Sequence, residues 1–342
     1  RNPATLFVSM IGLTAVLSMF MSNTAAAAVL VPIAVAVTAP LHEEAYRKAL
    51  VLGIAYAATI GGVGSAIGTP ANQLAIEFLE GFGGRSISFV EWFAFGLPMV
   101  VLFLPIMAVY LWKSSRIRVD QSHFAEARRI AQQERQKLGA PNRDQFIVLG
   151  VFAAVALGWL TQTFHGFHAG IIALAGAIAL FILGKLLPED LGRISWPALL
   201  TFGGGLTLGL FLVRTGTSDY LATRLTGLVG VPDVVAVLAV AMITLLLTTV
   251  ASNTASAAIL IPLAIPLAGV LGVSVTALVL VVAIASSVDF ALVVGTPPTM
   301  IAYATKLYTA GQIFRKGIIL DFVGILLLVL VVTRIWSLLG LV

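Results

Sequence analysis

Two uncharged stretches are too long to form single membrane-spanning helices. No Lys, Arg, Asp or Glu occurs from Asn2 to Leu41, nor from Val234 to Val288. As one straight helix the first stretch would be about 60 Å long, about twice the thickness of the hydrocarbon core of a bilayer. Each stretch is therefore predicted to fold back on itself as a helical hairpin, with turns at Ser22-Asn23-Thr24 and at the same tripeptide beginning at Ser252.

Further apolar runs predict the rest of the helices. We expect an interrupted helix near residues 61–70, helices at about 92–112, 146–161, 168–184, 197–213 and 317–338, and a second interrupted helix that begins at the end of the second uncharged stretch. Hydrophobic residues make up 59% of the chain and charged residues 10%, and the mean hydropathy is +1.05. Such a chain cannot cover a soluble domain with polar surface, so the predicted fold class is an all-α polytopic membrane protein. The absence of cysteine excludes disulfides and thiolate metal sites.

The distribution of Lys and Arg orients the chain. Sixteen of the twenty lie at Arg1 or in the expected loops 41–48, 113–145, 185–196 and 306–316, which we assign to the cytoplasm. The hairpins are separated by five predicted crossings, so they enter the membrane from opposite sides. This pattern is typical of secondary transporters with inverted repeats. We expect a multi-pass protein of the plasma (inner) membrane.

The two hairpins are also similar in sequence. Between Ser22–Ala34 and Ser252–Ala264, nine of thirteen positions are identical. Each hairpin is followed by a Gly-Thr-Pro motif, in GGVGSAIGTPAN from Gly61 and in VGTPPT from Val294. Gly loosens a helix, Thr can cap the next one, and Pro suits its first turn, so these motifs predict broken helices.

Four helix N-termini can then meet near the middle of the membrane. They follow Asn23, Asn253, Thr69 and Thr296, and together they carry roughly two positive charge equivalents without Lys or Arg. The neighbouring carbonyl ends lie near residues 18–22 with Gly68, and near residues 248–251 with Gly295. They offer the oxygen ligands that an alkali cation takes. A dianion and cations are therefore expected as neighbours.

These paired motifs, together with ISWPALLTFGGGLTLG from Ile194, resemble those of the divalent-anion/sodium symporter (DASS) family over essentially the whole chain. The resemblance implies a homodimer whose transport domains move like elevators against fixed scaffolds. It implies transport segments at 1–112 and 233–342, scaffold helices within 146–232, and a linker at 113–145. It also implies four further N-terminal helices that this chain does not contain, so we expect a piece of a longer protein.

The resemblance also implies site residues. Sodium would be held at a first site by Ser18, Ser22, Asn23 and Gly68, and at a second by Thr248, Ala251, Asn253 and Gly295. The substrate would be bound by Asn23, Thr24, Thr69, Pro70, Asn253, Thr254, Thr296 and Pro297. The implied function is sodium-coupled symport of small divalent anions, C4-dicarboxylates such as succinate, with no organic cofactor.

The chain departs from the family pattern at three places. The usual Thr-Pro-Pro-Asn is Thr-Pro-Ala-Asn at 69–72 and Thr-Pro-Pro-Thr at 296–299, and an acid, Asp289, stands where the family usually has a small residue. An intramembrane carboxylate is a candidate for coupling transport to H⁺ or to a cation. A structural partner for a buried donor is the alternative.

The same residues leave other functions open. A proton-coupled carrier or an anion exchanger of the same fold remains open, as does a passive anion channel. The stretch Lys113–Arg143 predicts an amphipathic helix on the cytoplasmic membrane surface rather than a nucleic-acid site. His165 and His168 lack a carboxylate for a metal site, and His42-Glu43-Glu44 lacks the second His of a zinc-protease helix. The chain is not expected to be an enzyme.

Overall fold

The computed structural model describes residues 3–41, 43–115, 117, 129, 132, 136, 139–194, 196–224 and 230–342. Within these ranges the regular structure is helical throughout, without a strand, which confirms the all-α class. Five helices are long and apolar enough to cross a membrane, and a sixth span is possible if α10 and α11, bent by 74° at their junction, are counted as one. The expected amphipathic helix at 113–143 falls largely outside the described residues.

The first half of the chain contains α1 (Pro3–Ser18), α2 (Asn23–Thr38), α3 (Glu44–Gly61), α4 (Pro70–Gly81), α5 (Phe89–Ser114), α7 (Arg143–Leu160), α8 (Gln162–His165) and α9 (Ala169–Ile182). The second half contains α10 (Trp196–Arg214), α11 (Thr217–Arg224), α12 (Asp233–Val250), α13 (Asn253–Leu271), α14 (Val275–Ala285), α15 (Pro297–Ala304), α16 (Ala310–Leu327) and α17 (Thr333–Leu338). Short 3₁₀ turns occupy Ala39–Leu41, Gly62–Gly64 and Pro188–Arg193, and a π turn at Leu328–Val332 joins α16 to α17.

Both uncharged stretches fold back at the predicted tripeptides. In α1–α2 the side chain of Ser22 caps α2 by accepting from the Ala25 amide at 3.2 Å, and in α12–α13 Ser252 accepts from the Ala255 amide at the same distance. Ser is favoured at this position because its oxygen satisfies an amide that the helix leaves unpaired. The second helix of each hairpin therefore begins with the same serine cap.

Both Gly-Thr-Pro motifs interrupt a helix, as predicted. The first separates α3 from α4, and the second separates α14 from α15. Thr69 and Thr296 occupy the N-cap positions with extended backbones, but neither side chain makes a capping hydrogen bond. The expectation of side-chain capping by threonine was therefore wrong; Thr296 instead pairs with the hydroxyl of Thr299 at 2.9 Å.

Two other expectations need correction. The segment 306–316 was expected to be a loop, but α16 begins at Ala310 and forms a continuous apolar span to Leu338. Thr309 starts it with a capping box to Gln312, which stabilises a helix across the basic residues. The helix α11 was not expected at all.

The broken helices α3 and α14 form the centre of the molecule. Nearly all side chains from Leu50 to Gly61 and from Leu278 to Ala285 are fully buried. A helix that is apolar on every side is stable only when it is surrounded by protein or lipid. These buried helices therefore hold the two breaks in fixed positions.

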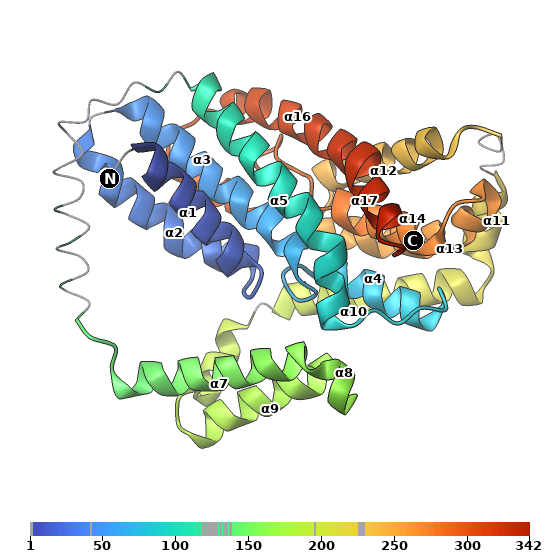
Figure 1. Ribbon diagram of the computed structural model, residues 1–342, viewed down its shortest axis with the longest axis horizontal. Helices are drawn as coiled ribbons and strands as arrows, with labels where there is room; N and C mark the ends of the chain where they lie inside the picture. The colour runs from blue at the N-terminus through green and yellow to red at the C-terminus, as the bar shows by residue number, and fades with distance from the viewer. Residues whose placement is uncertain are drawn as a thin grey trace.

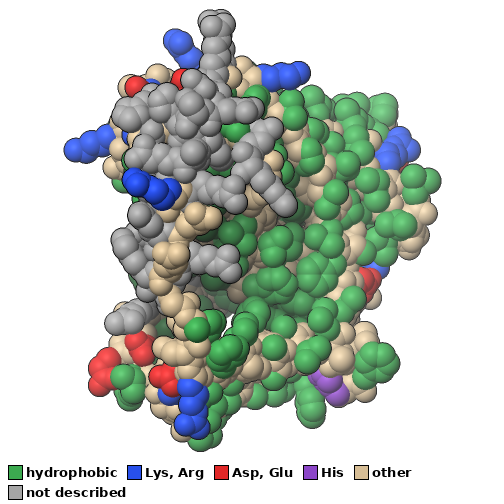
Figure 2. Space-filling view, turned by 60° about the vertical axis from the view of Figure 1, so that its left-hand side comes forward, with side chains coloured by type: hydrophobic (Ala, Val, Ile, Leu, Met, Phe, Trp, Pro, Cys, Tyr) green, Lys and Arg blue, Asp and Glu red, His purple; other side chains and the backbone are tan. Residues whose placement is uncertain are grey.

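In Figure 1 the pair α7–α9 lies apart from the main body, on the same side as α10. It touches α5 where Trp159 of α7 stacks on Phe89 at 5.2 Å, and Gln162 of the adjoining α8 accepts from the Phe89 amide at 3.2 Å. The face shown in Figure 2 is covered largely by hydrophobic side chains outside the grey residues. On α10, Leu200 is 74% exposed. Such surfaces suit contact with lipid.

The helix α10 approaches α13 and α4 very closely. A side chain at Gly205 would overlap Ala258 of α13, and one at Gly209 would overlap Pro262 of α13 and Phe78 of α4. Glycine at these positions lets backbones pack side by side, as is common between membrane helices. The contact places the start of α10 beside the hairpin tips.

Candidate functional site

A cavity of about 560 Å³ lies where the hairpin tips meet the helix breaks. All eight residues expected to bind substrate line it: Asn23, Thr24, Thr69, Pro70, Asn253, Thr254, Thr296 and Pro297. They come from the first turns of α2, α4, α13 and α15. The structure thus brings together residues that are more than 200 positions apart in the chain.

The side chains that line the cavity in the described part of the chain include hydroxyls and amides but no charged group. None of the described residues that line it is Lys, Arg, Asp, Glu or His. Four helix N-termini open into it instead, since the lining includes the first residues Asn23, Pro70, Asn253 and Pro297. Each N-terminus carries roughly half a positive charge from unpaired amides. The arrangement suits a small anion.

The helix α10 contributes two lining residues that the sequence did not indicate. Pro197 and Thr201 lie in the first turns of α10 and face the cavity. The hydroxyl of Thr201 donates to the Pro197 carbonyl at 2.8 Å. Both residues lie within the motif that begins at Ile194. The sequence of an apolar helix does not show which of its faces lines a cavity, so neither residue could be assigned from the motif.

The residues expected at the first cation site lie around the Asn23 amide. Ser18 is fully buried, lies 2.7 Å from this amide and donates to the Ala58 carbonyl at 2.6 Å. With its nitrogen turned toward these groups, Asn23 also donates to the carbonyls of Ala58 and Gly68, at 3.0 and 3.3 Å. Ser22 caps α2 at the cavity edge. Oxygen atoms of the first hairpin tip and of the first helix break therefore lie together around Asn23.

The second tip repeats this arrangement. The Thr248 hydroxyl lies 2.9 Å from the Asn253 side-chain amide and donates to the Ser286 carbonyl at 2.7 Å, just as Ser18 lies beside the Asn23 amide and donates to the Ala58 carbonyl. Gly295 lines the cavity beside Asn253. Ala251 ends α12 with an extended backbone.

Asp289 lies in the second break and is fully buried. Neither carboxylate oxygen has a hydrogen-bond partner in the described part of the chain. The carboxylate lies against Gly295, where an added side chain would overlap it. Among the described residues, no buried donor pairs with this carboxylate, so nothing there supports the alternative of a structural partner.

A second buried acid, Asp321, was not indicated by the sequence. It stands on α16 and accepts from the amides of Phe290 and Ala291 at 2.7 and 3.1 Å. Its only sequence signal was an acid within an apolar run. His165 ends α8, His168 caps α9 and neither is among the residues that line the cavity, and the described residues contain no cluster of acids and histidines that could hold a metal.

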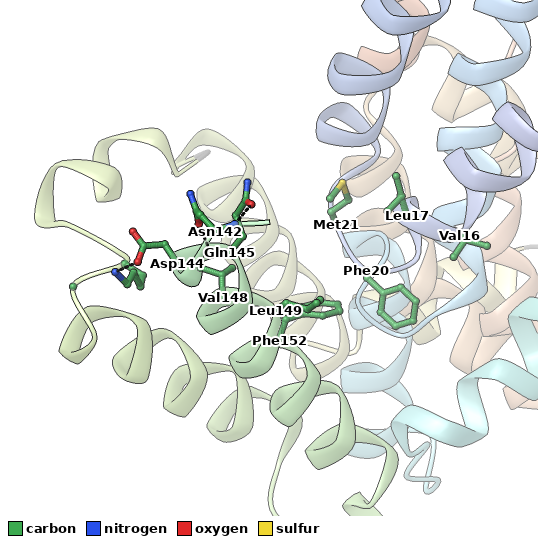
Figure 3. Close-up of a pocket in the computed structure, with 12 residues that line it drawn as sticks. Val16, Leu17, Phe20, Met21, Asn142, Asp144, Gln145, Val148, Leu149 and Phe152 are labelled. Atoms are coloured by element: carbon green, nitrogen blue, oxygen red, sulfur yellow. Dashed lines mark hydrogen bonds and ion pairs between the residues drawn. The ribbon is translucent and has the colours of Figure 1, made fainter. Parts of the chain in front are cut away.

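A larger hollow of about 670 Å³ lies between the end of α1 and the start of α7. Figure 3 shows Phe20 and Met21 on one side and Leu149 and Phe152 on the other. Its lining is mostly apolar and includes none of the expected site residues. The residues expected to bind substrate therefore all line the smaller cavity.

Comparisons with known proteins agree with this picture. Residues 3–342 match the sequence model of the sodium:sulfate symporter transmembrane region. The sodium-dependent dicarboxylate transporter SdcS of Staphylococcus saprophyticus is 30% identical over 347 residues, covering 93% of this chain and 67% of the relative. The transporter of the same name from Staphylococcus aureus (strain NCTC 8325) is 31% identical over 348 residues, covering 93% and 66%. The chain thus spans about two thirds of the length of these relatives.

The family match covers nearly the whole described structure, including both tips and both breaks. Its members are transporters rather than enzymes, and the apolar spans make this chain a multi-pass plasma membrane protein. The chain therefore belongs to the sodium:sulfate symporter family, which is the DASS family that its paired motifs resemble.

Proposed function

We propose that the protein is a sodium-coupled symporter of small divalent anions, with C4-dicarboxylates such as succinate as the preferred class. The observation that carries this proposal is the convergence of four helix N-termini on one cavity without charged lining among the described residues. Roughly two positive charge equivalents match a dianion. The volume of about 560 Å³ lies in the range of small-molecule sites.

Recognition of the substrate falls to both repeats. One carboxylate would meet the side chains of Asn23 and Thr24 with the start of α4, and the other would meet Asn253 and Thr254 with the start of α15. Amide and hydroxyl groups can donate hydrogen bonds to carboxylate oxygens, and prepositioned donors lower the cost of binding. The printed names of the relatives, which are sodium-dependent dicarboxylate transporters, support this substrate class.

Sodium is proposed to bind beside each tip. The first site would use Ser18, Ser22, Asn23 and Gly68, and the second would use Thr248, Ala251, Asn253 and Gly295. Hydroxyl, amide and backbone carbonyl oxygens are the ligands that hard cations prefer. The matching hydrogen bonds of Ser18 and Thr248 support two similar sites. A cation at each tip would offset the charge of the substrate.

The two halves are proposed to be inverted repeats. Five crossings separate the hairpins: the broken helix α3–α4, then α5, α7, α9 and α10. An odd number of crossings places the second hairpin upside down relative to the first. The hydrogen-bonded triads of Ser18 and Thr248 support a common origin of the two halves.

Transport is proposed to proceed by an elevator movement in a homodimer. Residues 1–112 and 233–342 would form the moving transport domain, and helices within 146–232 the scaffold, joined by a cytoplasmic linker at 113–145. The close contact of Gly205 and Gly209 with the side chains of Ala258 and Pro262 on α13 lies at the proposed boundary. Narrow, smooth contacts of this kind allow helices to slide.

The test is uptake of labelled succinate into proteoliposomes, with the protein in the longest form that its gene encodes. An inward sodium gradient should support saturable uptake, and replacement of sodium by choline should abolish it. Excess citrate and sulfate, tested as competitors, would rank the preferred anions. Uptake driven by a proton gradient or by internal anion would overturn sodium coupling, and unsaturable flux would indicate a channel.

A further inference from the structure

We propose that the Asp289 carboxylate is a direct, negatively charged ligand of the cation at the second tip, which makes the two cation sites unequal. This inference rests on the proposed sodium coupling and specifies one of its two sites. It begins from three buried oxygens without partners in the described part of the chain: Ser287 Oγ and both carboxylate oxygens of Asp289. Buried charges in proteins are paired or coordinate a metal, because leaving them bare is costly.

The position of the carboxylate points to the cation site. It fills the space beside Gly295, which lines the cavity together with Asn253. In the first repeat, the matching space beside Gly68 is filled by the backbone carbonyl of Gly62. An acid therefore stands in the second repeat where the first has a neutral carbonyl oxygen.

The first repeat also satisfies its carbonyls internally. The Asn72 amide is fully buried and donates to the carbonyls of Gly62 and Ser65 at 3.0 and 2.7 Å. The same place after the second Gly-Thr-Pro motif is taken by Thr299, whose hydroxyl pairs with Thr296 instead. The second repeat therefore has a carboxylate, Asp289, where the first has a carbonyl. It lacks the asparagine amide that could donate a hydrogen bond to this carboxylate.

The segment around Asp289 is held in place independently. Asp321 accepts from the amides of Phe290 and Ala291, and Tyr56 of α3 donates to the Phe290 carbonyl at 2.9 Å. Asp321 adds a second acid and cannot neutralise the first. No ion pair joins Asp289 to a basic side chain within the described ranges. The local field therefore favours a cation.

A charged ligand should make the second site the tighter one. The number of charged ligands shifts the affinity of oxygen-based cation sites by orders of magnitude. Removing the charge while keeping the shape, in Asp289→Asn, is expected to raise the sodium concentration for half-saturation about tenfold. The affinity for succinate at saturating sodium should change little.

The test measures sodium binding without transport. Thermal unfolding of the purified protein, in the longest form that its gene encodes, is followed against sodium chloride, with choline chloride keeping the ionic strength constant. Asp289→Glu keeps the charge and should retain most of the response. Asp144→Asn on α7 is the control, because it removes the same charge from an exposed ion pair with Lys185.

Thr299→Asn gives a second route if Asp289→Asn does not fold. The new amide can donate to the carboxylate as Asn72 does to its carbonyls, so it should compete with the cation and raise the half-saturating sodium concentration. Failure of Thr299→Asn to shift that concentration would then overturn the inference.

The outcomes separate this inference from the proposed function. If the wild type responds to sodium and Asp289→Asn follows the same curve, only the inference fails. If Asp289→Asn keeps its sodium response and loses a pH dependence, the group is a proton site and the inference also fails. If the wild type shows no sodium response in unfolding or in uptake, sodium coupling and the inference fall together.

Discussion

Replacing Asp321 by alanine is expected to loosen the second break while leaving the first untouched. Asp321 accepts two hydrogen bonds from consecutive amides of this break, at 2.7 and 3.1 Å, and is fully buried. Asp321→Ala leaves both amides without an acceptor in a buried place. Each orphaned donor costs about 1–3 kcal/mol, so the free energy of unfolding should fall by about 2–6 kcal/mol.

Tyr56→Phe provides a matched comparison at the same segment. It removes one hydrogen bond between neutral groups, from the Tyr56 hydroxyl to the Phe290 carbonyl, and keeps the aromatic contact of the two rings at 4.9 Å. Its expected cost is about 0.5–1.5 kcal/mol. Asp321→Asn keeps one acceptor oxygen and should fall between the two variants.

Thermal unfolding in detergent, followed by the fluorescence of the five tryptophans, measures these differences. At about 2 °C per kcal/mol for a large domain, Asp321→Ala should lower the unfolding midpoint by about 4–12 °C and Tyr56→Phe by about 1–3 °C. A midpoint for Asp321→Ala equal to that of Tyr56→Phe would refute the reasoning, because the two amides would then have found other partners.

Three further outcomes are expected. The double variant Gly205→Cys/Ala258→Cys, in a chain without native cysteine, should lose uptake in proportion to the cross-linked fraction, measured against the same variant reduced with dithiothreitol; uptake that is equal with and without the cross-link would exclude movement of α10 against α13. Asn72→Ala removes the donor to the first break and should lower stability by about 1–3 kcal/mol, measured by the same unfolding assay; an unchanged midpoint would count against this role. Ser18→Ala and Thr248→Val should each raise the sodium concentration for half-maximal succinate uptake, and effects on succinate alone would contradict the cation sites.

The hairpins and breaks could be predicted from the sequence because polar or helix-breaking residues stood within long uncharged stretches. Asn23 and Asn253 were visible as repeated polar residues at the middle of such stretches, where backbone groups need partners. The same logic found the Gly-Thr-Pro breaks. The repeated motifs and the thickness of the membrane were then enough to predict that the four helix N-termini meet near the middle of the membrane.

Other site features depend on packing that a sequence does not contain. Pro197 and Thr201 reach the cavity only because α10 lies beside the tips. Asn72 holds the first break because its amide nitrogen lies within 2.7 to 3.5 Å of three backbone carbonyls, to which it donates hydrogen bonds. The start of α16 was misplaced because charge was taken to mark a loop, whereas a capping box begins the helix ahead of its basic residues.

The close approach of α10 to α13 also bears on how fast such a carrier can work. Gly205 and Gly209 have no side chain at this contact, so α13 could move past them without displacing side chains of α10. The free-energy profile along the proposed slide is then smooth, and friction between the two surfaces is low. Bulk added at either glycine would roughen this profile, so it would slow the turnover of bound substrate and leave the strength of binding largely unaltered.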